Sequence, residues 1–242
     1  MEILFFLAAF VSEIIGTIAG FGSSTVFLPL ALSFFDFKTA LILVALLHIF
    51  GNLGRISFFK SGLDKRTILI FGIPSVVMTL IGASLISFIP QDFLKGILGI
   101  FLIVYALLSL WKEGLKVKQS LFTSIIGGGL SGFLAGLIGT GGALRGAFLT
   151  AFSLPKEKYI ATAAAIALAV DITRIPIYFA GGFLNSQLYF YIPILLIVAL
   201  AGSFSGKQIV KRVPQKIFKR TVLIAILAVG TKFIYDLLKY LF

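Results

Sequence analysis

Apolar runs long enough to cross a lipid bilayer follow one another along almost the entire chain. The hydrocarbon core of a bilayer is ~30 Å thick, and an α-helix of about 20 apolar residues spans it. Inside lipid every backbone N–H and C=O group needs an internal partner, so only helices and closed barrels are stable there. A barrel would alternate polar and apolar residues, whereas these runs are apolar on all sides. We therefore predict an all-α polytopic membrane protein.

Composition supports the bilayer as the solvent. Of the 242 residues 59% are hydrophobic and 12% are charged, too few polar residues to cover a soluble domain. The net charge of +12 does not indicate a nucleic-acid partner, because the Lys and Arg residues lie mostly in short gaps between apolar runs, as cytoplasmic anchors do. The chain has no cysteine and a single histidine, so we expect no metal site and no cofactor. We expect the first apolar run to belong to the mature protein.

The chain contains two copies of one unit. A Gly-x-x-x-Gly pair at Gly16 and Gly20 recurs at Gly132 and Gly136. Further along, an offset of 119 residues aligns Asn52 with Asp171 and Arg55 with Arg174. A duplicated unit is the usual plan of secondary transporters. We predict a first repeat at residues 1–111, a cytoplasmic linker at residues 112–119 and a second repeat at residues 120–242.

Each repeat contains four apolar segments, and the first segment of each is too long for one simple helix and carries glycine near its middle. The eight predicted segments are residues 2–35, 39–60, 67–89, 93–111, 120–153, 158–180, 188–206 and 217–238.

The basic residues in the gaps decide between two topologies. If each first segment simply crossed the membrane, Lys and Arg would be spread almost evenly over both sides. If each first segment enters and returns on the same side, most of them gather on one side, as they do on the cytoplasmic face of membrane proteins. We therefore predict six full crossings and two hairpins, with both termini outside the cytoplasm. The second repeat is then inverted relative to the first.

The two glycine breaks predict an anion site. A broken helix exposes backbone groups that are tolerated inside a membrane only beside protein or a watery cavity. Helices restarting after the breaks would present free N–H groups and partial positive charge to an anion. A nearby arginine fork suits an oxyanion. The predicted substrate-binding residues are Gly22, Ser23, Ser24, Thr25, Gly139, Thr140, Gly141, Gly142 and Arg145. The alternative is that these glycines only allow helices to pack closely.

Charged and polar side chains inside the apolar segments are costly in lipid, so they mark a pathway or pair with one another. We assign pathway or gating roles to Asn52, Arg55, Asp171 and Arg174, and possible proton-coupling roles to Glu13 and His48. Three alternatives stay open. Asp171 and Arg174 share a helical face and can form an internal ion pair; Arg55 can extend to the cytoplasmic interface; His48 can be a hydrogen-bonded packing residue.

The stretches GFGSSTVFLP at residues 20–29 and GLIGTGGA at residues 136–143, together with the duplicated unit, resemble the TauE/SafE sulfite exporter family over essentially the whole chain. The resemblance implies transport of sulfite or of organosulfur anions such as sulfoacetate. The two copies differ within the pattern, because Ser23 and Ser24 stand where the second copy has Thr140 and Gly141.

We therefore predict a secondary transporter of the cell membrane that exports small sulfur-containing anions by alternating access, with a small anion and the lipid bilayer as partners. A homodimer stays open. Two rival functions are a lipid-diphosphate phosphatase, which would need clustered acidic residues where Glu13 stands alone, and an anion channel. We predict that the chain is not an enzyme.

Overall fold

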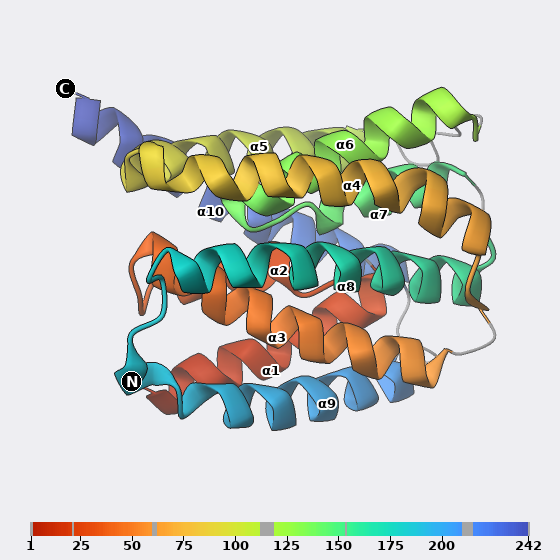
Figure 1. Cartoon of the computed structure of the whole chain (residues 1–242), viewed down its shortest axis with the longest axis horizontal. Helices are drawn as coiled ribbons and strands as arrows, with labels where there is room; N and C mark the ends of the chain where they lie inside the picture. The colour runs from red at the N-terminus through yellow and green to blue at the C-terminus, as the bar shows by residue number, and fades with distance from the viewer. Residues whose placement is uncertain are drawn as a thin grey trace.

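The computed structural model describes residues 2–20, 22–59, 62–111, 119–152, 154–209 and 215–241. Within these ranges the chain is helical and contains no strand, as predicted. Figure 1 shows most of the helices running along the long axis of the molecule, in layers, with both ends of the chain at the same end of the bundle.

The helices within the predicted first repeat are α1 (Glu2–Ala19), α2 (Ser24–Ala31), α3 (Phe37–Phe58), α4 (Lys65–Leu85), the 3-10 helix η2 (Ile86–Phe88) and α5 (Gln91–Trp111). Those of the second repeat are α6 (Leu121–Ile138), α7 (Gly142–Ala151), α8 (Lys156–Ala180), the 3-10 helix η3 (Ser186–Leu188), α9 (Tyr191–Ile209) and α10 (Gln215–Leu241). The eight predicted apolar segments correspond to these helices, and the first segment of each repeat is split in two.

The predicted linker at residues 112–119 lies outside the described residues except for Gln119. The Gln119 Nε2 donates a hydrogen bond to the Thr67 hydroxyl at 2.8 Å, which ties the last residue of the predicted linker to α4.

Seven stretches of the described chain are long and apolar enough to cross a membrane. They are residues 2–19, 37–58, 65–88, 91–108, 121–138, 157–180 and 186–209. The predicted hairpins have unequal arms, which the sequence did not indicate. α1 and α6 have 18 residues each, or about 27 Å at 1.5 Å per residue, whereas α2 and α7 have 8 and 10 residues. The orientation of the repeats in the membrane stays a prediction.

Short polar residues set the helix starts at the ends of the bundle. The Asp36 carboxylate accepts hydrogen bonds from the N–H groups of Lys38 and Thr39 at the start of α3. The Asp64 carboxylate accepts from the Thr67 N–H at 2.8 Å at the start of α4. Such caps satisfy N–H groups that lack a partner within the helix. The same Thr67 N–H lowers the pKa of Asp64, because it stabilises the ionised carboxylate.

Most contacts between two helices have a counterpart between the equivalent helices of the other repeat. α4 packs along α6, and the equivalent pair, α9 and α1, also packs together. α3 contacts α9, and its counterpart α8 contacts α4. The helices at equivalent positions, α3 with α8, α5 with α10 and α2 with α7, contact each other directly. Two copies of one structural unit would produce this pattern of contacts.

Glycines let α4 and α6 approach closely. The Ser75 hydroxyl donates to the Gly128 carbonyl and the Thr79 hydroxyl donates to the Gly132 carbonyl, each at 2.9 Å. A Cβ atom at Gly132 would lie 2.0 Å from the Ser75 carbonyl oxygen, and one at Gly136 would lie 2.4 Å from that of Thr79. Close packing of α4 against α6 is thus the role of this glycine pair. In the first repeat Gly16 instead contacts the backbone of the turn into α2.

We expect Gly132→Ala to destabilise the protein by at least the ~1–3 kcal/mol typical of overpacking, because the new methyl group would meet backbone rather than a movable side chain. Gly129→Ala is the matched control, since its Cβ would meet the Met78 side chain at an ordinary 3.5 Å. Thermal unfolding of both variants in detergent checks this prediction. Equal melting temperatures would show that α4 and α6 do not pack as described.

Candidate functional site

The backbone breaks where the sequence predicts. Gly20 and Gly22 have φ values of 78° and 97° between α1 and α2, and Gly139 has a φ of 73° after α6. These left-handed conformations are strained for residues with a side chain. The new helices begin at Ser24 and at Gly142, and both turns are buried.

The two restarting helices meet. The Thr25 and Thr140 hydroxyls lie 2.8 Å apart and share a hydrogen bond, and neither side chain is exposed. The first N–H groups of a helix have no partner within it and carry partial positive charge. One such helix start from each predicted repeat therefore lies in the buried interior.

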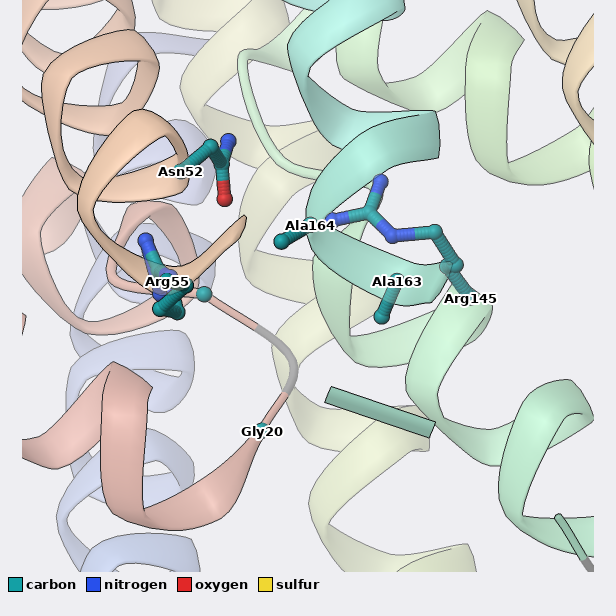
Figure 2. A pocket seen from close by; sticks show the side chains of 7 residues that line it. Gly20, Asn52, Arg55, Arg145, Ala163 and Ala164 are labelled. Carbon is teal, nitrogen blue, oxygen red and sulfur yellow. The ribbon is translucent and has the colours of Figure 1, made fainter. Parts of the chain in front are cut away.

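A small pocket lies beside the first break (Figure 2). Its lining comprises Gly20, Gly22, Asn52, Arg55, Arg145, Ala163 and Ala164. Figure 2 shows the Arg145 side chain extending past α8 toward the side of the pocket that carries Asn52 and Arg55.

The pocket includes some of the predicted site residues and leaves others out. Of the predicted binding residues, Gly22 and Arg145 line it, together with Asn52 and Arg55, to which the sequence assigned pathway roles. The remaining predicted binding residues are buried but lie outside this lining: Ser23, Ser24, Thr25, Gly139, Thr140, Gly141 and Gly142.

Arg55 is paired inside the protein rather than extended to the interface. The Arg55 residue is 1% exposed, and its Nη2 lies 2.9 Å from Glu13 Oε1. The interpretation of Arg55 as a residue reaching the membrane surface was therefore wrong. Its Nε and Nη1 atoms have no hydrogen-bond partner among the described residues. These two donors belong to a buried side chain that lines the pocket.

Glu13 is held in a slot that small residues form. A Cβ atom at Gly51 would lie 2.1 Å from Glu13 Oε1, and a Cβ atom at Gly202 would lie 2.8 Å from the Glu13 Cβ. The Ser203 hydroxyl donates to Glu13 Oε1 at 3.4 Å. α3 and α9 thus leave room for this one carboxylate, which fixes it beside Arg55.

A second cluster is centred on Asp171. Its Oδ2 lies 2.9 Å from His48 Nδ1 and accepts a hydrogen bond from Asn52 Nδ2 at 3.1 Å. Its Oδ1 accepts from Arg174 Nε at 3.0 Å, so the internal ion pair, which the sequence left open as an alternative, is present. Arg174 Nη1 also donates to the Ala135 carbonyl at 2.8 Å. Asn52 and Asp171, which occupy equivalent positions in the two repeats, are therefore direct partners.

The two equivalent arginines are held differently. Arg174 is paired with Asp171 and is also fixed to the backbone of α6, where the neighbouring Tyr178 hydroxyl donates to the Gly136 carbonyl at 2.7 Å. Arg55 is fixed by the Glu13 side chain on α1. The sequence analysis did not single out Tyr178, although a tyrosine within an apolar segment was an available signal. The Arg174 side is held together by backbone contacts, whereas the pocket lies on the Arg55 side.

The buried charges do not balance. Within the described ranges the buried charged residues comprise three arginines, Arg55, Arg145 and Arg174, against the two carboxylates of Glu13 and Asp171. With His48 neutral, these buried charges sum to one positive charge, which favours an anion over a cation as ligand. Among the described residues no three His, Asp or Glu side chains gather as metal ligands would.

A polytopic helical architecture with a charged pocket enclosed by its helices is typical of membrane transport proteins. A family model described as "Sulfite exporter TauE/SafE" matches residues 4–233, and the chain belongs to this family. The chain is also 28% identical over 241 residues to a protein of Methanocaldococcus jannaschii named "Probable membrane transporter protein MJ0441". That alignment covers 88% of this chain and 86% of the relative. The resemblance seen in the glycine-rich stretches is confirmed, and the chain is a multi-pass member of a membrane transporter family.

Proposed function

We propose that this chain carries a small oxyanion across the membrane and binds it in the pocket between Arg55 and Arg145. The observation that carries the proposal is that two buried arginines, Arg55 and Arg145, line the same pocket, where Arg55 Nε and Nη1 have no hydrogen-bond partner among the described residues. Two guanidinium groups would otherwise repel each other at low dielectric. A mobile anion between them would reduce this repulsion.

The pocket chemistry favours an oxyanion. Guanidinium groups offer donors in a planar fork that matches carboxylate, phosphate and sulfur oxyanions. The start of α2, which follows the Gly20–Gly22 turn, adds the partial positive charge of a helix N-terminus. Sulfite, or an organosulfonate such as sulfoacetate, fits both these donors and the family description.

We further propose that transport occurs by alternating access. The repeats have matching contacts, yet the pocket lies beside Arg55 while Arg174 is fixed to the Ala135 carbonyl. Exchanging these two arrangements between the repeats would expose the site to the other side of the membrane. We expect the plasma membrane as the location, with both termini outside. An inside-negative potential drives anions outward at ~2.3 kcal/mol per charge per 100 mV, which favours export.

An anion panel tests the proposal on purified protein. Sulfite, sulfate, thiosulfate and sulfoacetate are added separately in detergent, with zwitterionic taurine for comparison, and thermal unfolding is followed. A bound anion at 100 times its Kd is expected to stabilise the protein by about 2.7 kcal/mol. The stabilisation should be absent in Arg145→Ala. If no oxyanion stabilises the wild type, or if Arg145→Ala is stabilised equally, the pocket is not the binding site.

Flux measurements separate a carrier from the two rivals. A carrier that changes conformation at every cycle is limited to the microsecond-to-second range of collective motions, so a turnover above ~10³ s⁻¹ would favour a channel. Release of inorganic phosphate from a lipid diphosphate by the purified protein would favour an enzyme. In the described part of the chain both buried carboxylates are paired with arginine, which supports transport over catalysis.

A further inference from the structure

We propose that Glu13 binds a proton when a divalent anion enters the pocket, so that anion and proton are carried together. The inference rests on the proposed function of the Arg55–Arg145 pocket and names its coupling ion. The Arg55 guanidinium lies between a fixed carboxylate and the proposed anion site: it contacts Glu13 at 2.9 Å and also lines the pocket.

The fixed carboxylate competes with the solute. Glu13 is fully buried, and the close approach of Gly51 and Gly202 leaves its side chain little room to move. While Glu13 is ionised, part of the positive charge of Arg55 is already neutralised inside the protein. Once Glu13 is protonated, the whole charge of Arg55 faces the pocket, so the anion binds more tightly.

The charge count sets the stoichiometry. With Glu13 ionised, the described buried charges sum to one positive, which matches a monovalent anion. With Glu13 protonated, they sum to two positive, which matches a divalent anion. A dianion therefore occupies the pocket together with one proton, which passes from water to a Glu13 oxygen on binding and returns to water on release. No other bond changes.

The surroundings of Glu13 contain few competitors for this proton. Of the elements that pack against α1, α2 carries no titratable side chain, and α3 carries His48 and Arg55 in its buried stretch. α9 carries Lys207, four residues beyond Ser203, with its ammonium 5.3 Å from the Phe58 ring centre. His48 is engaged with Asp171, so it is the rival proton carrier that the experiment must distinguish.

Binding linkage makes the inference measurable, because a proton that strengthens anion binding must itself be bound more strongly when the anion is present. Sulfate is a suitable probe, since it stays divalent between about pH 5 and pH 8. We expect the wild-type affinity for sulfate to rise as the pH falls, by up to tenfold per pH unit for one linked proton. Calorimetric titrations in buffers of different ionisation enthalpy should report uptake of about one proton per sulfate bound.

Three variants identify the residue that binds the coupled proton. In Glu13→Gln the affinity for sulfate is expected to be independent of pH and close to the wild-type value at low pH, with no proton uptake. His48→Gln should retain the pH dependence, and Asp92→Asn, which changes a carboxylate of the partly exposed Asp92–Lys95 pair, should retain it too. Loss of proton uptake in His48→Gln but not in Glu13→Gln would overturn the assignment.

The wild type alone provides a test if Glu13→Gln does not fold. A difference infrared spectrum should gain a protonated carboxyl band when sulfate binds. Sulfate binding without proton uptake in the wild type would refute the coupling while leaving the proposed anion site intact. Failure of the wild type to bind sulfate, or any other oxyanion of the panel, at every pH would refute both.

Discussion

Vesicles containing Arg145→Ala are expected to lose anion transport while the protein stays folded. Removing one partner of a buried charge interaction costs about 2–5 kcal/mol, so we expect uptake of sulfite into inside-out vesicles to fall at least about 30-fold. The fold should survive, because the substitution removes one of three buried arginines where positive charge is in surplus. Initial rates of sulfite uptake, measured at equal amounts of incorporated protein, check the prediction.

Two further variants test which property of Arg145 transport requires and whether the effect is specific to this site. Arg145→Lys keeps the charge but loses the planar fork, so its rate should lie between those of the wild type and Arg145→Ala. Lys95→Ala removes a basic side chain that is partly exposed and paired with Asp92, and it should transport at the normal rate. Normal flux through Arg145→Ala would mean that Arg145 does not contact the transported anion.

The largest loss of stability is expected from Asp171→Asn. The Asp171 carboxylate contacts His48, Asn52 and Arg174 at distances of 2.9 to 3.1 Å, and it is fully buried. Neutralising it leaves the Arg174 guanidinium without its counterion. Breaking a buried pair in this way costs about 3–5 kcal/mol, which should lower the melting temperature by on the order of 10 °C in a protein of this size.

The double variant Asp171→Asn/Arg174→Gln tests the cause. If the damage comes from an unpaired arginine, removing its charge should recover part of the lost stability, which a double-mutant cycle would measure as a coupling energy. Asp92→Asn, at a partly exposed pair, should change the melting temperature little. An Asp171→Asn protein as stable as the wild type would show that Arg174 is held by its backbone contact alone.

Local features of the sequence predicted most of the architecture. The helices follow the apolar runs, and the breaks fall at Gly20, Gly22 and Gly139 because a residue there must adopt a positive φ. The ion pair between Asp171 and Arg174 was also predictable, because residues three apart share a helical face. Arg145 entered the predicted binding set because it follows the second break closely, and it lines the pocket beside the first break.

Contacts between distant segments were not predictable in the same way. The pairing of Glu13 with Arg55 depends on how α1 lies against α3, and neither residue has a local signal for the other. The contact of Asn52 with Asp171 was implied by the repeat, since equivalent positions can meet where equivalent helices cross, but only after the crossing of α3 and α8 is known. The placement of the pocket beside one arginine rather than midway between two also depends on this packing.

The hydrogen bond between Thr25 and Thr140 has a mechanical consequence. It joins the start of α2 to the turn before α7 by a contact worth about 1 kcal/mol. If one repeat rotates against the other during transport, we expect the region around this hydrogen bond to move least. Spectroscopic labels near the hydroxyl pair would then keep a constant separation, while labels at the far ends of α1 and α6 would show the widest swing.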